Sequence, residues 1–533
     1  MASTDPDALP LEHPNLLSAL AGWVSRGPGR PALRYRGRTV TVAELDTLAH
    51  AVAAGLRQRG VVSGDRVALC VQNVPQFPVA TLGIWRAGAI AVSVSPLLRA
   101  HEVDKLLIDA GAVALVVDDI HWCQVIGTGE VADTLRCVLT TAADDLLAVQ
   151  PAPPAAADSH AVPLLQLLDE QDGVRVPNPA TGPDDLAFLT YTSGTTGPAK
   201  GACNTHGNIV AGGQVYRDLA GIGPDDVIAG LAPMFHVTGI TGHLALAVVS
   251  GAVLALDQRF DAASALAMLE RERATFTIAA ITALDALRHD PSAAQTDLRR
   301  LTKVWSGGQA IPAATADALE SWLGVPPRNA YGMTETTYPC LMVPAGERAP
   351  VDPATGIVAV GRPTPGTRVR VVAEDGTDVP RGEPGELVVR GPGVVPGYWQ
   401  RPQESAQALA GGYLHTGDVG FVDADGWFFV VDRKKDVINA SGFKVWPREV
   451  EDVLVAHPAV REAVVVGVPD ERRGELVAAF VSLVPGVSAA PDELIGYARE
   501  RLAAHKYPRR VTVVDEIPKT ASGKLMRRAF RNQ

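Results

Sequence analysis

Short apolar runs alternate with helical patterns over the first 120 residues. Thr41 and Glu44 form a capping-box pattern, which opens a helix predicted to run to about Arg59. Short buried runs separated by helical segments are typical of parallel strands in an α/β sheet. The runs predicted as strands are Arg66–Val71, Ala89–Val94 and Val113–Val117, and a helical segment is predicted at Val79–Arg86.

The pattern changes at several points along the chain. Residues 141–163 are rich in Ala, Pro and Asp and are interpreted as a surface excursion or linker, after which the α/β pattern resumes at Leu186. From 350 to 431, frequent Gly and Pro with shorter strand patterns indicate a mostly antiparallel, β-barrel-like region. A small α/β unit is predicted after the charged run 432–436. The predicted elements of this unit are a helix at Pro447–Ala456, strands at Ala463–Val468 and Ala478–Leu483, and a helix at Pro491–Ala504.

The predicted fold class is therefore α/β. We expect a large N-terminal domain of α/β sheets over 1–434, with a β-rich subregion at about 350–431. A small α+β C-terminal domain is expected over 435–533.

Composition and charge exclude several classes of protein. The 533 residues are 47% hydrophobic and 20% charged, with a net charge of −11, which excludes a disordered chain and argues against nucleic-acid binding. Five scattered cysteines without a CxxC pair favour a reducing compartment. The longest apolar stretch, Leu244–Leu256, is too short to span a bilayer, so no transmembrane segment is predicted. We expect a cytoplasmic protein; the oligomeric state stays open, with a homodimer as one option.

The strongest local signal follows the apolar run Leu186–Leu189. Glycines let backbone N–H groups approach a phosphate, hydroxyls add donors and a lysine adds charge. The spacing differs from the P-loop pattern, so we predict a phosphate-binding loop of another kind. The alternative is an ordinary surface turn. The segment runs from Tyr191 to Gly201 and contains Thr192, Ser193, Gly194, Thr195, Thr196, Gly197 and Lys200.

This segment resembles the signature loop of the adenylate-forming superfamily, which includes acyl-CoA synthetases, peptide-synthetase adenylation domains and firefly luciferase. Further segments resemble the family's other motifs in the family's order, closest in look to bacterial fatty-acid or aryl and alicyclic acid–CoA ligases. They are Ala232–His236, Gly307–Gln309, Tyr331–Thr336, Tyr413–Asp418, Asp432–Lys435, Ser441–Lys444 and Pro518–Lys524.

The resemblance implies a nucleotide site. Tyr331 would stack on adenine, with Gly332 and Gly308 beside it. Thr334 would contact phosphate, and Glu335 would hold Mg²⁺, since a hard cation prefers carboxylate oxygen. By the same resemblance the ribose hydroxyls would contact Asp418 and Arg433, and the β- and γ-phosphates would lie on the 192–200 loop. A Thr-Glu pair and a Gly-Asp turn are both common without any such role.

The resemblance also implies two exchangeable arrangements of a mobile C-terminal domain. Lys435 lies where the family places its hinge, and Lys524 corresponds to the lysine that enters the site during adenylation. Gly442 and Lys444 match the loop that forms the thiolation tunnel, with Lys444 near a coenzyme A phosphate. The alternatives are a basic tail around Lys524 and a solvated surface lysine at 444.

The acyl pocket is assigned to His236, Gly307, Gly308 and Met333. A lone histidine after an apolar strand is also compatible with a packed core residue. The expected pocket walls are His236–Gly242, Ala279–Ala286 and Gly307–Ile311. These segments are small and apolar and carry no Arg or Lys to pair a second carboxylate, so a fatty, alicyclic or aromatic acid is expected.

The predicted function is an ATP-dependent acid–thiol ligase, an AMP-forming acyl-CoA synthetase. It would use ATP and Mg²⁺, with coenzyme A as co-substrate, for adenylation and then thioester formation by domain alternation. Lys524, Lys200, Thr334 and Glu335 are the predicted catalytic residues, and Glu335 is the metal ligand. Two alternatives stay open: transfer of the acyl group to a carrier protein or amine, and a relative that runs one half-reaction only.

Overall fold

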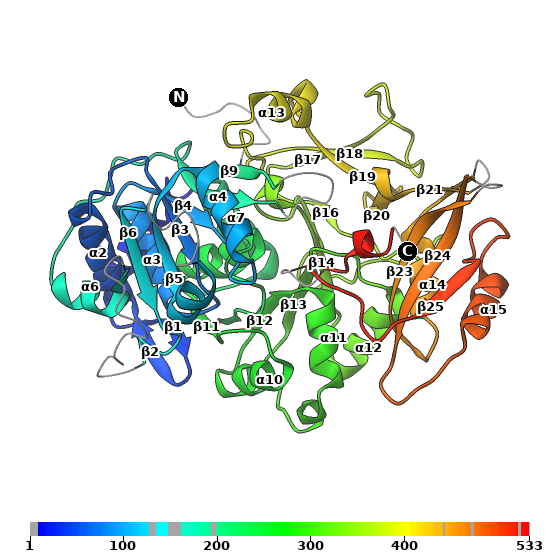
Figure 1. Cartoon of the computed structure of the whole chain (residues 1–533), viewed down its shortest axis with the longest axis horizontal. Coiled ribbons are helices and arrows are strands. Elements are labelled where there is room, and N and C mark those ends of the chain that lie inside the picture. Colours follow the sequence, from blue (N-terminus) through cyan, green and yellow to red (C-terminus); the bar gives the residue numbers. More distant parts are fainter. Residues whose placement is uncertain are drawn as a thin grey trace.

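The computed structural model describes residues 9–126, 135–147, 161–192, 199–440, 443–470, 474–520 and 524–531. These residues form four β-sheets with helices between and around them (Figure 1). The seven-stranded sheet lies at one end (blue to cyan), the nine-stranded sheet occupies the middle, and the last sheet (orange to red) lies at the other end. The observed fold is mixed α/β, as the pattern predicts.

The seven-stranded sheet is parallel except for its last pair. Its strands in spatial order are β7 (Ala161–Pro163), β6 (Cys137–Thr141), β5 (Ala112–Asp118), β3 (Arg66–Cys70), β4 (Ile90–Ser93), β8 (Leu186–Tyr191) and β9 (Gly201–Thr205). The three predicted strands in this region are confirmed. The excursion predicted at 141–163 begins and ends in strands, β6 and β7, and its 148–160 part lies outside the described residues.

The nine-stranded sheet combines a parallel centre with antiparallel edges. Its strands in spatial order are β16 (Arg362–Pro363), β15 (Leu341–Met342), β14 (Arg328–Tyr331), β13 (Lys303–Gly307), β12 (Phe276–Ala279), β10 (Val227–Ala229), β11 (Val253–Leu256), β1 (Pro31–Tyr35) and β2 (Arg38–Thr41).

Apolar helices cover these two sheets. Thr41 caps α2 (Val42–Gln58), its hydroxyl accepting from the Glu44 amide at 3.2 Å, so the predicted cap is confirmed. Every residue of α3 (Gln76–Arg86) is buried, which suits a helix that is mostly apolar all round. The other helices are α1 (Leu16–Arg26), α4 (Ala100–Ala110), α5 (Asp119–His121), α6 (Leu164–Glu170), α7 (His206–Ala220), α8 (Val237–Gly239), α9 (Leu246–Ser250), α10 (Ala262–Arg271), α11 (Ile281–His289), α12 (Ala313–Leu323) and α13 (Pro402–Ala408).

The predicted antiparallel region is a four-stranded sheet, β17 (Arg368–Val372), β18 (Gly385–Arg390), β19 (Leu414–Val422) and β20 (Phe428–Arg433). Every pairing is antiparallel, and no closed barrel forms among the described strands.

The last sheet comprises β22 (Phe443–Val445), β21 (Ile438–Ala440), β24 (Gly474–Leu483), β23 (Val460–Asp470) and β25 (Arg510–Val513), with helices α14 (Pro447–Val455) and α15 (Pro491–Arg501). The predicted strands and helices are confirmed. Strand β23 is longer than expected because it pairs with β24 over most of its length. Helix α14 also contacts β20, which brings the last sheet's layer against the four-stranded sheet.

Candidate active site

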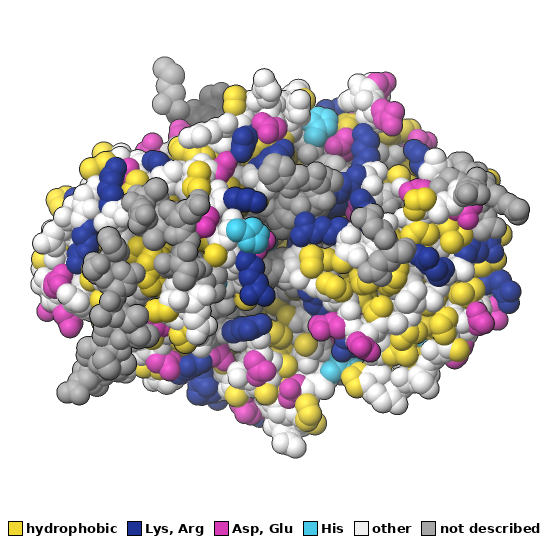
Figure 2. Space-filling model, viewed as in Figure 1, with side chains coloured by type: hydrophobic (Ala, Val, Ile, Leu, Met, Phe, Trp, Pro, Cys, Tyr) yellow, Lys and Arg dark blue, Asp and Glu magenta, His cyan; other side chains and the backbone are white. Residues whose placement is uncertain are grey.

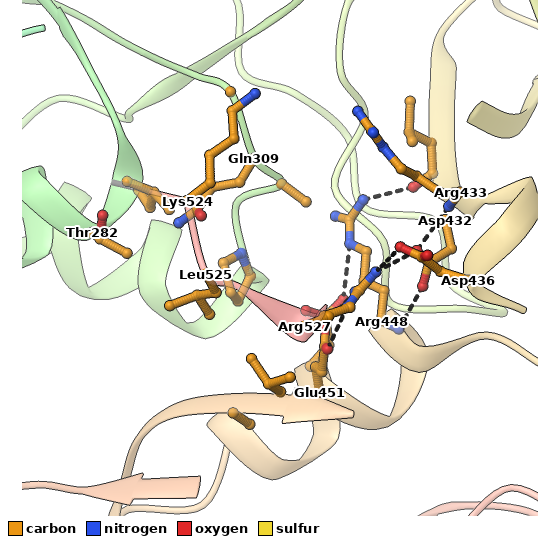
Figure 3. Close-up of a pocket in the computed structure, with 18 of the residues that line it drawn as sticks. Thr282, Gln309, Asp432, Arg433, Asp436, Arg448, Glu451, Lys524, Leu525 and Arg527 are labelled. Atoms are coloured by element: carbon orange, nitrogen blue, oxygen red, sulfur yellow. Dashed lines mark hydrogen bonds and ion pairs between the residues drawn. The ribbon is translucent and has the colours of Figure 1, made fainter. Parts of the chain in front are cut away.

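A cleft of about 390 Å³ lies where α14, β23 and the chain's last segment face β14, β20 and α11 (Figure 3). Its lining draws on parts of the chain more than 200 residues apart, from Ile281 to Arg531. The ends of β13 and β14 open into it, so residues that follow these parallel strands share one edge of the sheet. Gly308, Tyr331, Gly332, Met333, Asp418, Arg433, Lys435 and Lys524, all predicted site residues, line this cleft.

Asp418 is held by two partners at the floor of the cleft. The Tyr331 hydroxyl donates to Asp418 Oδ2 at 2.7 Å, and Arg433 Nε lies 3.2 Å from Oδ1. Asp418 and Arg433 face each other across β19 and β20. Burial raises the pKa of Asp418, although the Arg433 charge and the Tyr331 hydrogen bond oppose that shift. The arrangement presents a buried carboxylate that suits a ligand's hydroxyl donors.

Lys524 reaches across the cleft to Gly308. Its Cε lies 3.0 Å from the position that a Cβ would take on Gly308, whose φ of +88° also favours glycine. Figure 3 shows Lys524 on the Gln309 and Thr282 side of the cleft. Burial lowers the pKa of Lys524, and Arg433 adds to that shift, whereas Asp418 and Glu335 oppose it. The ammonium is therefore poorly solvated and surrounded by predicted site residues.

Glu335 is oriented by a residue that sequence reasoning missed. The Tyr398 hydroxyl donates to Glu335 Oε1 at 2.8 Å, and Lys200 Nζ lies 5.1 Å from the centroid of the Tyr398 ring. Burial and the Glu335 charge raise the pKa of Tyr398. An antiparallel β-bridge between Ala202 and Tyr398 places this tyrosine beside β9. No local sequence pattern predicts this pairing. Tyr398 thus connects the end of the predicted phosphate loop to the predicted metal ligand.

The predicted phosphate loop joins two antiparallel strands, β8 and β9. At its base, the Thr192 amide donates to the Lys200 carbonyl at 3.0 Å, so the two flanking residues are fixed together. Ser193, Gly194, Thr195, Thr196 and Gly197, predicted to bind phosphate, lie outside the described residues.

Backbone packing fixes the 331–336 motif. A Cβ on Gly332 would lie 2.8 Å from the Tyr338 carbonyl oxygen, so only glycine fits there. Asn204 Nδ2 donates to the Thr334 carbonyl at 3.3 Å and to Thr337 Oγ1 at 2.9 Å. Thr334 itself is buried. Sequence reasoning also missed Asn204, whose role depends on a contact 130 residues away.

His236 begins the short helix α8. Its Nδ1 accepts from the Thr238 amide at 3.3 Å. Burial, helped by the nearby Lys524 charge, lowers the pKa of His236 to about 3, so the imidazole is neutral near pH 7. Gly307 ends β13, where a Cβ would approach the Ala330 carbonyl oxygen at 3.0 Å.

Of the two predicted thiolation residues, Gly442 and Lys444, only Lys444 is described, and it does not line the cleft. Lys444 is exposed on β22, opposite Asn439 of β21, and is absent from the cleft's described lining. Gly442 lies outside the described residues. Lys435 does line the cleft, and burial, with Arg433, lowers its pKa. The structure therefore brings Lys524 to the cleft together with the hinge candidate, and leaves Lys444 away from it.

The donor set around Glu335 suits a metal that arrives with phosphate. Among the described residues, no three His, Cys, Asp or Glu side chains gather to form a metal cage. Mg²⁺ is commonly bound by one or two carboxylates together with substrate phosphates, so a single carboxylate beside a phosphate loop fits this cation.

The charge distribution on the molecular surface is uneven. Figure 2 shows Lys and Arg side chains gathered down the middle of one face, although the whole chain carries a net charge of −11. A local positive field attracts anionic ligands regardless of net charge. In the part of the chain that the structure describes, no helix is long and apolar enough to cross a membrane.

Comparisons with known proteins match nearly the whole chain. A family model described as AMP-binding enzyme matches residues 20–399, and one described as AMP-binding enzyme C-terminal domain matches residues 449–524. A long-chain-fatty-acid–CoA ligase of Bacillus subtilis is 32% identical, over 98% of this chain and 95% of its own length. A feruloyl-CoA synthase of an Amycolatopsis species is 36% identical, over 96% of this chain and 99% of its own length.

Solved structures give the same result for the fold. An anthranilate CoA ligase in complex with anthranoyl-AMP has a TM-score of 0.88 and 28% identity, with 98% of each chain covered. A benzoate CoA ligase from Burkholderia xenovorans has a TM-score of 0.84 and 27% identity, covering 97% of this chain and 99% of its own.

Proposed function

This chain belongs to the family of AMP-binding enzymes, and we propose that this ATP-dependent acid–CoA ligase activates a hydrophobic acid. Lys524 acts on the acid and ATP, whereas Asp418, Arg433 and Glu335 hold the nucleotide and its metal. The enzyme uses ATP and Mg²⁺, with coenzyme A as co-substrate. The main support for these residue roles is that one cleft is lined by Tyr331, Asp418, Arg433 and Lys524.

In the first half-reaction, the substrate carboxylate attacks the α-phosphorus of ATP and pyrophosphate leaves. A carboxylate is already ionised at neutral pH, so no general base is needed. The residues act by positioning and by stabilising charge. Asp418 accepts from the ribose hydroxyls, and Tyr331 stacks on adenine while its hydroxyl holds Asp418.

Lys524 stabilises charge between the carboxylate and the α-phosphate. Its buried position makes an ammonium costly until a negative partner arrives, and the developing negative charge of the transition state supplies that partner. Lys200 and the 192–197 segment hold the β- and γ-phosphates. Glu335, oriented by Tyr398, would hold Mg²⁺, which would supply positive charge beside the phosphates.

In the second half-reaction, the thiol of coenzyme A attacks the acyl carbon and AMP leaves. The 435–533 domain rotates about Lys435 to withdraw Lys524 and bring the Gly442 loop, with Lys444, to the cleft. Lys444 lies away from the cleft while Lys524 occupies it, which supports this exchange.

The chemistry of the pocket walls supports a hydrophobic acid. Segments 237–242 and 307–311 carry no Arg or Lys, and His236 is neutral, so a second carboxylate would be buried without a cationic partner. Asp285, a carboxylate in the cleft lining, already pairs with Arg288 at 2.9 Å, which leaves it less suited to a substrate amine. Relatives named for ferulate, anthranilate, benzoate and long-chain fatty acids are compatible with this class.

Matched sets of acids test the substrate class. Each set contains a monocarboxylic acid, its dicarboxylic counterpart and its α-amino derivative, built on an aromatic, an alicyclic and a fatty skeleton. We expect kcat/KM for the unsubstituted acid to exceed that of its charged derivatives by at least about 100-fold, the cost of an unpaired buried charge. Preference for an amino or dicarboxylic acid would contradict the proposal.

Two variants test the residue roles. Lys524→Ala should abolish acyl-AMP formation but largely spare thioester formation from supplied acyl-AMP. Gly442→Leu should do the reverse, by obstructing the thiol. Normal thioester formation by the leucine variant would refute the tunnel assignment, and equal loss of both half-reactions in the alanine variant would refute the role of Lys524. Release of acyl-AMP without acyl-CoA would instead point to a carrier protein or amine acceptor.

A further inference from the structure

We propose that Asp432, Arg448, Glu451 and Arg527 form a latch that holds Lys524 in the cleft and must open before the second half-reaction. Figure 3 shows these four side chains grouped together, on the opposite side of the cleft from Thr282 and Lys524. They are positioning residues, since they act through Lys524. The inference rests on the proposed rotation about Lys435.

Arg527 is the centre of the latch. Its Nη1 donates to Asp432 Oδ1 at 2.7 Å, and its Nε and Nη2 donate to the two oxygens of Glu451 at 2.9 and 2.6 Å. The Glu451 contact is a two-pronged guanidinium–carboxylate pair, the geometry that Lys cannot reproduce. The charges of Glu451 and Asp432 raise the pKa of Arg527 despite burial, so the guanidinium stays charged.

The position of Arg527 restricts the position of Lys524. The two residues are three positions apart, a span of at most about 10 Å. Antiparallel backbone pairing between 518–520 and 524–526 stiffens the segment further. The Thr520 amide donates to the Lys524 carbonyl at 2.8 Å, and the Met526 amide donates to the Pro518 carbonyl at 2.9 Å. Fixing Arg527 therefore fixes the base of the Lys524 side chain.

Asp432 is the acceptor on the other side of the predicted hinge. It is 5% exposed and is the last residue but one of β20, three positions before Lys435. Besides Arg527, it accepts from the Arg448 amide at 2.9 Å, while Arg448 Nη1 donates to the Val430 carbonyl at 2.6 Å. Arg448 lies on α14, beyond the hinge.

Rotation about Lys435 divides these contacts into two groups. Arg527 and Glu451 both follow the hinge, so their pair moves as a unit and persists. The contacts of Asp432 with Arg527 and Arg448 cross the hinge, so rotation breaks them. The crossing contacts stabilise only the arrangement with Lys524 in the cleft, and weakening them shifts the population towards the other arrangement.

Asp432→Asn tests the latch because it keeps the side chain's size and removes its charge. We expect acyl-AMP formation to slow about 10- to 100-fold, while thioester formation from supplied acyl-AMP is unchanged or faster. Arg527→Lys, which keeps charge without the two-pronged geometry, should give an intermediate loss, and Arg527→Gln a full one. Arg499→Gln, which removes an exposed arginine on α15, is the matched control and should leave both half-reactions unchanged.

Deuterium uptake by residues 524–531 gives a readout that does not depend on activity. Uptake should rise in Asp432→Asn and Arg527→Gln and stay at the wild-type level in Arg499→Gln. Equal slowing of both half-reactions, or unchanged uptake in both latch variants, would overturn the inference. If Asp432→Asn fails to fold, Arg527→Lys decides by the same two measurements. A wild-type enzyme that makes no acyl-AMP from any acid would refute the proposed function, and the uptake measurement would still decide the latch.

Discussion

Replacing Gly308 with alanine perturbs the contact between the large sheet's edge and Lys524. The change adds one methyl group to a residue with a φ of +88°, where L side chains are strained by roughly 1–2 kcal/mol. That strain is small against the ~5–15 kcal/mol that stabilises a folded domain, so we expect Gly308→Ala to fold. The new Cβ would lie 3.0 Å from Lys524 Cε.

The size of the effect follows from that distance. Ordinary contacts between carbon atoms are about 3.5–4.0 Å, so the lysine must retreat by roughly 0.5–1 Å. A misplacement of about 1 Å at a reacting centre commonly costs about 100-fold in rate, or ~2.7 kcal/mol. We therefore expect acyl-AMP formation to slow about 10- to 100-fold, while thioester formation from supplied acyl-AMP changes much less.

Rapid-quench measurement of acyl-AMP, beside a thioester assay that starts from supplied acyl-AMP, separates the two steps. Gly324→Ala is the matched control: Gly324 caps α12 with a φ of +75°, and no atom lies within 4 Å of its Cβ position. It should lose similar stability and keep normal activity. Equal slowing of both steps, or slowed adenylation in Gly324→Ala, would refute the reasoning.

Three further substitutions test the electrostatics of the cleft. Tyr331→Phe removes the donor to buried Asp418, worth about 1.5–3 kcal/mol, so the KM for ATP should rise about 10- to 100-fold in steady-state assays; an unchanged KM would contradict the ribose assignment. Tyr398→Phe should raise the Mg²⁺ concentration for half-maximal rate several-fold, because Glu335 loses its orienting hydroxyl; an unaltered Mg²⁺ titration would remove that role. Burial lowers the pKa of Lys524 below its usual value of 10.5, so kcat/KM for adenylation should fall as the pH rises through that lowered pKa. Lys524→Arg should move this fall to higher pH, because arginine stays charged. A fall at the same pH in the arginine variant would belong to another group.

Local patterns were sufficient to predict much of the fold. The Thr41 cap acts within four residues, and β3 at Arg66–Cys70 agrees with the predicted run Arg66–Val71 to within one residue. Strand β23 exceeds its apolar run because pairing with β24 extends it to Val460 at one end and through Pro469 and Asp470, which have weak strand preference, at the other. The antiparallel character of the 350–431 region is confirmed, but which strands pair depends on the whole sheet.

The site residues likewise fall into those that local motifs predict and those that depend on distant contacts. Motif residues such as Tyr331 and Asp418 could be named because each lies in a recognisable segment, and the structure brings the two within hydrogen-bonding distance. The contacts of Tyr398 and Asp432 could not be predicted from the sequence. Tyr398 meets Glu335 across 63 positions, and Asp432 meets Arg527 across 95. Such partners are set by how distant layers pack, which no short segment encodes.

The most direct test of the central claim follows the oxygen atoms of the substrate. Purified protein is given ATP, Mg²⁺, coenzyme A and a hydrophobic acid whose carboxylate carries heavy oxygen, and the products are measured by mass spectrometry. The account predicts acyl-CoA and AMP in equal amounts, with one heavy oxygen in AMP and none in pyrophosphate. Formation of ADP and phosphate, or of AMP without the label, would contradict attack by the carboxylate on the α-phosphorus.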